Sequence, residues 1–151
     1  MTDQKDAAHL ELKSGRVTIK LRPDLAPLHV ARIKELIGSK FYDGLKFHRV
    51  IKGFMAQTGC PEGTGTGGSG QKIKAEFSDE PFVRGTLGMA RSMSPDSGDS
   101  QFFITFGPTP HLDGEYTVWG QVIDGMEHVD QIAVGEPPRQ PDRIIKFSLA
   151  S

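Results

Sequence analysis

Cysteine is almost absent from this sequence: Cys60 is the single one among 151 residues, so no disulfide can form within the chain. No apolar run reaches the roughly 18 residues that a membrane-spanning helix needs. Residues 1–8 are polar and lack the apolar segment of a secretory signal. We therefore expect a cytoplasmic protein without membrane contact, with a flexible leader over residues 1–8 and a single domain over residues 9–151.

The sequence also lacks a charge excess of either sign. Lys and Arg number 18 against 19 Asp and Glu, which gives a formal net charge of -1, and no long run of like charges occurs. This balance provides no electrostatic field for nucleic acid, and with no long apolar run it favours a monomer. The histidines show no metal-ligand spacing, so we expect neither a metal nor a cofactor; they are His9, His29, His48, His111 and His128.

Glycine and proline are abundant, with 18 and 10 residues, which favours many turns and short strands. Alternating apolar residues predict a hairpin over 10–21, and helical spacing predicts a helix from Pro27 that ends at Gly38. Seven or eight strands with two helices and no βαβ alternation favour an antiparallel barrel with capping helices. Further strands are expected within 47–58, hinged at Gly53, and at 86–90, 101–106, 116–123 and 144–149, with a shorter helix from 126 to about 135.

The glycine-rich segment 59–70 must be a loop. It contains the dinucleotide-binding pattern G-x-G-x-x-G twice, from Gly63 and from Gly65. No helix is expected after Gly70, so there is no helix N-terminus to hold a pyrophosphate, and we interpret the segment as a loop that is flexible or flanks a groove.

The stretch 47–58 combines a cation, an imidazole, an amide and large apolar side chains, which is more varied chemistry than a packing strand needs. Two interpretations of the residues remain open. Phe54, Met55, Phe103 and Leu112 can be core residues with Arg49 as a surface cation. Alternatively, they can line an apolar pocket that has one strong hydrogen-bond donor beside it.

Four segments occur in an order and spacing that resembles the cyclophilin family: FHRVIKGFMAQTG at 47–59, GMA at 88–90, SQFFI at 100–104 and LDG at 112–114. The similarity extends from about residue 10 to residue 149, and it is greatest to short bacterial-type cyclophilins. The resemblance implies a mainly β fold, a closed eight-stranded antiparallel β-barrel capped by two helices. It also implies a peptidyl-prolyl cis/trans isomerase that acts on proline-containing peptides and on unfolded or folded protein clients and assists protein folding.

The resemblance further implies roles for individual residues. Arg49 is expected to be the catalytic residue, and the other positions are expected to bind substrate. They are Phe54, Met55, Phe103 and Leu112 for the proline ring, Gln57, Ala90, Arg91 and Gln101 for the peptide backbone, and His48, His111 and Tyr116 around the rim.

Some of these positions depart from the family pattern. His111 stands where the family commonly has a tryptophan that is associated with cyclosporin binding, so we expect only weak binding of cyclosporin. Tyr116 replaces a common histidine, and Ala90-Arg91-Ser92 replaces Ala-Asn-Ala with one extra residue before Gln101. These departures affect ligand preference more than chemistry.

Strand geometry separates two of the candidates. In a regular strand His48 and Arg49 point to opposite faces, so we expect Arg49 to be the catalyst and His48 to be a neighbour. A second hypothesis is a proline-peptide binding module that keeps the fold without useful turnover. Binding of an X-Pro peptide with no faster isomerisation would distinguish this module from an enzyme.

Overall fold

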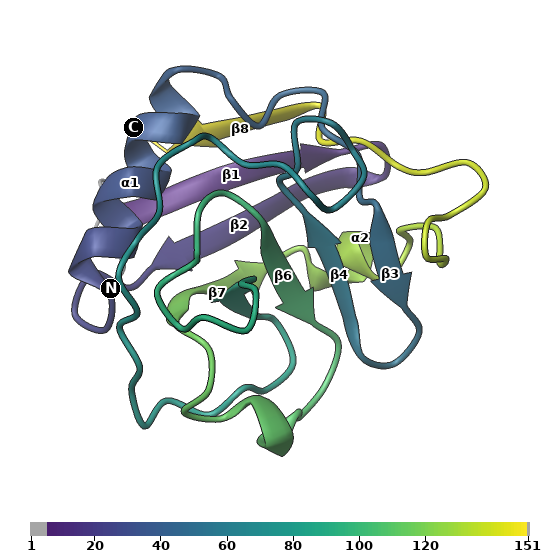
Figure 1. Cartoon of the computed structure of the whole chain (residues 1–151). Coiled ribbons are helices and arrows are strands. Elements are labelled where there is room, and N and C mark those ends of the chain that lie inside the picture. Colours follow the sequence, from purple (N-terminus) through teal and green to yellow (C-terminus); the bar gives the residue numbers. More distant parts are fainter. Residues whose placement is uncertain (1–5, 151) are drawn as a thin grey trace.

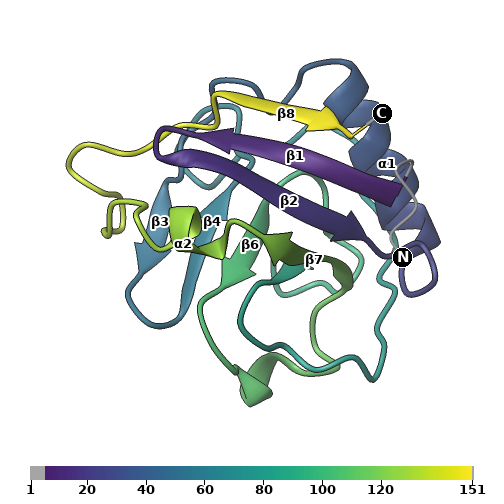
Figure 2. The same ribbon diagram turned by 180° about the vertical axis from the view of Figure 1, so that it is seen from behind.

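The computed structural model describes residues 6–150, which form one curved antiparallel sheet with two α-helices that pack on the same core and lie toward opposite ends of the molecule (Figures 1 and 2). Across the sheet the strands follow the order β3-β4-β6-β5-β7-β2-β1-β8. The elements are β1 (Ala7–Leu12), β2 (Gly15–Leu21), α1 (Pro27–Gly38), β3 (Arg49–Ile51), β4 (Met55–Thr58), β5 (Thr86–Met89), β6 (Phe102–Thr105), the short 3-10 helix η2 (Pro110–Leu112), β7 (Val118–Asp124), α2 (Met126–Val129) and β8 (Lys146–Leu149).

The main core lies between the inner face of the sheet and the apolar face of α1. Pro27 opens the helix, where its missing N–H would have no helical partner. Val30, Ile33 and Leu36 recur at helical spacing and are buried against the sheet. The predicted first helix is thus confirmed, as is the opening hairpin, in which β1 pairs antiparallel with β2.

The first strand begins earlier than expected. β1 starts at Ala7, and Ala8 is fully buried because it pairs with β2 on one side and with β8 on the other. The leader predicted over residues 1–8 therefore does not extend to Ala7 and Ala8. Residues 1–5 lie outside the described part of the chain.

The second helix is shorter than expected. α2 covers four residues, whereas the apolar spacing predicted a helix from 126 to about 135. Beyond its end, Gln131 and Ile132 donate their N–H groups to carbonyl groups three residues back, and Ala133 donates to the Asp142 carboxylate at 2.7 Å. These bonds replace the α-helical pattern with turns.

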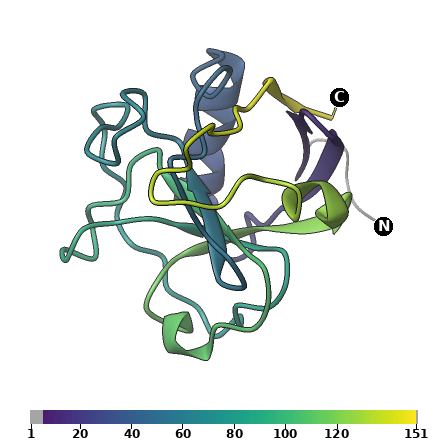
Figure 3. The same cartoon turned by 90° about the vertical axis from the view of Figure 1, so that its right-hand side faces the viewer.

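The sheet does not close into a barrel, so the predicted closed eight-stranded barrel is wrong and the observed form is a half-barrel. Within residues 6–150, no strand ladder joins the edge strands β3 and β8. Segments 44–47 and 142–144 bridge them with backbone hydrogen bonds of 2.7 to 2.8 Å, and the segment after α2 passes across this seam (Figure 3). Pro137, Pro138 and Pro141 have no N–H to donate, so this segment cannot supply a continuous ladder.

On each edge strand, at least one backbone group on the open side is nevertheless hydrogen-bonded to another part of the protein. On β3, Val50 exchanges two backbone hydrogen bonds of 2.8 and 2.9 Å with Gly135. On β8, the N–H of Phe147 donates to the Asp43 carboxylate at 2.9 Å. A loop therefore covers one edge of the sheet and a side chain covers part of the other.

The outer face of β3, β4 and β6 carries a second apolar cluster and a polar row. The register places Arg49 opposite Gln57, and Gln57 opposite Phe103. On the neighbouring strand β5, Gly88 lies opposite Phe103, which stacks on Phe82 with ring centroids 5.7 Å apart. A Cβ atom at Gly88 would lie 2.6 Å from Phe103 and 2.7 Å from Phe82, so this stack needs a glycine.

We expect Gly88→Ala to lower the free energy of unfolding by about 1–3 kcal/mol, because the added methyl group overpacks the buried Phe82–Phe103 stack. Urea denaturation measures the loss. Gly107→Ala is the matched control, since a Cβ atom there would have no neighbour within 4 Å. Equal stability of the two variants would contradict this account of the stack.

Candidate active site

A cavity of about 120 Å³ opens on the outer face of the sheet. Its walls come from the second apolar cluster, in which Met55, Phe103 and Leu112 are buried and Phe54 and Tyr116 are partly buried. Every lining residue belongs to the set that the resemblance implied. They are Arg49, Phe54, Met55, Gln57, Ala90, Arg91, Phe103, Leu112 and Tyr116.

Arg49 begins β3 at the border of this cavity, and its side chain is 45% exposed. Its Nη1 donates to Gln57 Oε1 over a long 3.4 Å, and its Nε donates to Glu136 Oε1 at 3.1 Å. Arg49 also lines a second, larger cavity of about 540 Å³ on the side of Glu136. Because a guanidinium stays protonated in proteins, a permanent cation stands beside the apolar pocket.

Two glutamines continue the polar row away from Arg49. Gln57 Nε2 donates to Gln101 Oε1 at 3.0 Å, and Gln101 Nε2 donates to the carbonyl oxygens of Gly65 and Gly67 at 2.9 Å each. Gln101 lies outside the apolar pocket but lines a neighbouring cavity of about 380 Å³ together with Gln57. The glycine-rich loop therefore borders the groove that the apolar pocket and this neighbouring cavity form together, and flanking a groove is one of the two roles expected for the loop.

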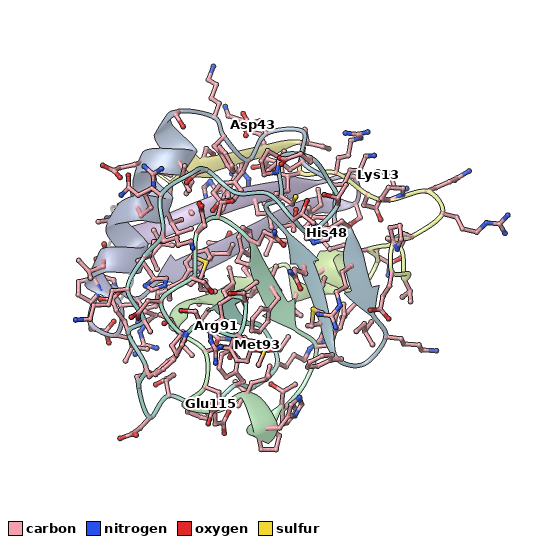
Figure 4. The ribbon with its side chains drawn as sticks, viewed as in Figure 1. Lys13, Asp43, His48, Arg91, Met93 and Glu115 are labelled. Atoms are coloured by element: carbon pink, nitrogen blue, oxygen red, sulfur yellow. The ribbon has the colours of Figure 1, made fainter. Side chains whose placement is uncertain are left out.

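Arg91 lines both the apolar pocket of about 120 Å³ and the neighbouring cavity of about 380 Å³. Its guanidinium lies 4.6 Å from the ring centre of Tyr116, a cation–π distance, and 5.9 Å from that of Phe77. Its Nε and Nη2 donate to the Glu115 carbonyl oxygen at 3.1 and 2.6 Å, and Nη1 donates to that of Ser92 at 3.0 Å. Arg91 and Glu115 both lie in the lower part of the view in Figure 4. Each nitrogen of this guanidinium already has a partner in the protein.

Two expected rim histidines lie outside the apolar pocket. His48 is 7% exposed and lines the cavity of about 540 Å³, at the upper end of β4 in Figure 4. Burial lowers the pKa of His48 below its usual range, so its imidazole is neutral at pH 7. His111 packs on Phe54, with ring centres 5.5 Å apart.

Glu136 and Phe82 belong to the site but were not expected from the sequence. Glu136 lies in a proline-rich segment, 87 positions from the arginine that it contacts, so no spacing pattern connects them. Phe82 stacks on the pocket residue Phe103, and it lies in an irregular segment without apolar periodicity. The tight approach at Gly88 likewise depends on strand pairing, which a single sequence does not reveal.

Cys60 holds the glycine-rich loop through hydrogen bonds to its thiol. It is fully buried, and its Sγ accepts the N–H groups of Gly65 and Gly67 at 3.3 Å each. Burial alone would raise the pKa of the thiol, but the backbone N–H groups around it, led by that of Gly67, lower it to about 7.

Two classes of feature are missing from residues 6–150. No group of three or more His, Cys, Asp or Glu side chains in this part of the chain could hold a metal ion. No helix there is long and apolar enough to cross a membrane.

The fold is that of a cyclophilin. A family model described as "Cyclophilin type peptidyl-prolyl cis-trans isomerase/CLD" matches residues 7–149. A cyclophilin from Hirschia baltica has a TM-score of 0.90 and 27% identity, with 98% of this chain and 75% of that chain covered. A Cryptosporidium parvum cyclophilin solved in the presence of the dipeptide Ala-Pro has a TM-score of 0.90 and 30% identity, with 96% and 99% covered.

Relatives with an assigned activity give the same result. The probable peptidyl-prolyl cis-trans isomerase of Brucella suis is 50% identical in a match that covers 97% of this chain and 84% of that protein. Peptidyl-prolyl cis-trans isomerase B of Bacillus subtilis is 46% identical over 124 residues, 81% of this chain and 86% of that protein. The chain belongs to the cyclophilin-type peptidyl-prolyl cis-trans isomerase family, and it is an enzyme of this activity.

The thiol of Cys60 should make stability depend on pH. Its pKa is lower in the folded state than in the unfolded state, so its contribution is complete above the unfolded pKa of about 8.5 and is lost as the pH falls through about 7. Between pH 6.5 and 9, we expect the free energy of unfolding of the wild type to rise relative to Cys60→Ala by on the order of 1 kcal/mol. Urea denaturation under reducing conditions measures this.

Cys60→Ser is the control for this experiment, because a hydroxyl group does not titrate in that range. Its pH dependence should match that of Cys60→Ala. A wild type that runs parallel to both variants would show that the loop does not favour the thiolate.

Proposed function

We propose that Arg49 is the catalytic residue and that the apolar pocket holds the proline ring of the substrate. The observation that carries this proposal is the guanidinium of Arg49 at the border of the 120 Å³ pocket. Rotation about an X-Pro bond breaks amide conjugation against a barrier of about 18–20 kcal/mol, without breaking any covalent bond. The site therefore needs no nucleophile, and it must favour the twisted amide over both planar forms.

A twisted amide localises a lone pair on the prolyl nitrogen. A guanidinium N–H can donate to this nitrogen only after conjugation is lost, so the hydrogen bond stabilises the transition state more than either ground state. Arg49 suits this task because its charge is permanent and its donors lie in a rigid plane. The donors of Arg91 are occupied by carbonyl groups, so Arg91 shapes the wall and Arg49 supplies the hydrogen bond.

The remaining site residues fix the substrate around the rotating bond. Phe54, Met55, Phe103 and Leu112 exclude water from the ring, as the burial of the last three and the packing of Phe54 against them support. Gln57 is exposed to both the apolar pocket and its neighbour, so it can hold the flanking peptide backbone. In this proposal Gln101 and Ala90 extend the backbone contacts, and Tyr116, His48 and His111 border the bound chain.

We further propose that the clients are proline-containing peptides and protein chains whose folding the enzyme assists in the cytoplasm. The Cryptosporidium parvum cyclophilin, whose structure was solved in the presence of the dipeptide Ala-Pro, supports this substrate class. A single cysteine is consistent with this location, because the fold does not depend on a disulfide or on an oxidising compartment. The protein is proposed to act as a monomer and as a single domain, which includes β1 from Ala7 onward.

Arg49→Ala should lower kcat/KM for an X-Pro peptide by about 100-fold, because it removes a donor aimed at charge that develops in the transition state. Exchange NMR on a short X-Pro peptide measures both isomerisation and binding. Arg49→Lys keeps the charge but loses the planar donors, so its kcat/KM should lie between those of the wild type and Arg49→Ala.

Lys52→Ala is the matched control, since Lys52 is an exposed cation in the β3–β4 turn and does not line the pocket. It should isomerise the peptide as fast as the wild type. Full activity in a folded Arg49→Ala variant would remove Arg49 from the mechanism. Peptide binding without acceleration by the wild type would favour the binding-module hypothesis.

Cyclosporin should bind weakly, because His111 offers a smaller apolar surface than the tryptophan that is common at this position in the family. His111→Trp should then tighten binding by about tenfold, which corresponds to about 1.4 kcal/mol of added contact. Isothermal titration calorimetry measures both affinities. Tight binding by the wild type, or no gain in His111→Trp, would contradict this role of position 111.

A further inference from the structure

The guanidinium of Arg49 has a carboxylate partner on the side away from the apolar pocket. Glu136 Oε1 accepts the Nε–H of Arg49 at 3.1 Å, and the two residues together line the cavity of about 540 Å³. Glu136 does not line the 120 Å³ pocket, so it does not compete for the space that the proline ring needs.

The backbone brings Glu136 to this place. Val50 and Gly135 form an isolated antiparallel bridge and exchange two hydrogen bonds, at 2.8 and 2.9 Å. In an antiparallel pair, the residue before one partner lies across from the residue after the other, so Arg49 and Glu136 form a cross-strand pair. Gly135 has a φ of +152°, and a Cβ atom there would lie 2.5 Å from Pro138, so the bridge depends on this glycine.

The ion pair has little value for stability. The side chains are 45% and 57% exposed, and such exposed pairs typically contribute about 0–1 kcal/mol. Its effect is on geometry instead. With Nε held by Glu136 and Nη1 directed at Gln57, two directions of the planar guanidinium are set, and the rotation of the group about its long side chain is restricted.

We propose that Glu136 is a positioning residue, which holds the guanidinium of Arg49 in the orientation that meets the prolyl nitrogen. This inference rests on the proposed role of Arg49 and extends it to a residue of the segment after α2. The contact of Arg49 with Gln57 is long, at 3.4 Å, so the carboxylate is the stronger of the two constraints.

The carboxylate has a second, opposing effect. Its negative charge weakens the positive potential that Arg49 presents to the substrate. Substitution by glutamine keeps an oxygen that can accept the Nε–H but removes the charge, whereas substitution by alanine removes both. The two variants therefore separate orientation from charge.

The test compares the wild type, Glu136→Ala and Glu136→Gln by exchange NMR with one X-Pro peptide, with kcat and KM measured separately. Loss of orientation should lower kcat of Glu136→Ala by about tenfold, with KM and the melting temperature little changed. Glu136→Gln should retain kcat within about threefold of the wild type, because the acceptor remains.

Glu11→Ala is the matched control. Glu11 and Arg16 also form a cross-strand pair, between β1 and β2, in which the carboxylate accepts an Nε–H at 2.7 Å. Its loss should leave kcat unchanged. The proposal is overturned if Glu136→Ala keeps the kcat of the wild type, or if Glu136→Gln loses as much as Glu136→Ala.

The Nε–H signal of Arg49 in a ¹⁵N spectrum gives a readout that does not depend on catalysis. It should be protected from exchange in the wild type and in Glu136→Gln, and lost in Glu136→Ala. If Arg49→Ala proves fully active, the catalytic role of Arg49 fails. The Nε–H signal, compared between the wild type and Glu136→Ala, still reports whether Glu136 holds the side chain of Arg49. If the signal is unaffected in Glu136→Ala, the positioning role fails even where Arg49 is catalytic.

Discussion

The alternation of side chains along paired strands is the constraint on which this enzyme depends. On β3, β4 and β6, one set of residues closes the main core, and the residues between them build the groove on the opposite face. The register then brings Arg49, Gln57 and Phe103 into one row across the three strands. A shift of one residue would bury the arginine and expose the core, so folding and the assembly of the candidate active site depend on the same pairing.

Polar groups keep this row in place although much of it is open to water. Gln57 and Gln101 link Arg49 to two carbonyl groups of the glycine-rich loop, and the thiol of Cys60 holds the N–H groups of the same glycines. Gly65 has a φ of +92°, a conformation that favours glycine and lets both of its backbone groups be used. The loop thus acts as a support for the groove, which explains its glycine content better than nucleotide binding does.

Patterns within short segments were sufficient to predict much of the local structure, whereas the members of the pocket were predicted only through the resemblance to cyclophilins. The helix at 27–38, the opening hairpin and the split of 47–58 at Gly53 are all observed. The closed barrel was wrong, because the prolines near residue 140 leave the seam without a ladder. The partners of Arg49 and Phe103 were missed for a related reason: Glu136 and Phe82 reach them through pairing between distant, irregular segments.

The covered edges of the half-barrel have a consequence for a protein whose substrates are themselves peptide chains. An open edge strand offers free N–H and C=O groups, and an extended peptide can add to it as another strand. Here Gly135 occupies the backbone of β3, and the Asp43 carboxylate takes an N–H of β8. Extended chains therefore find fewer places to attach by strand addition, which leaves the proposed substrate site as the surface from which a bound chain can also dissociate.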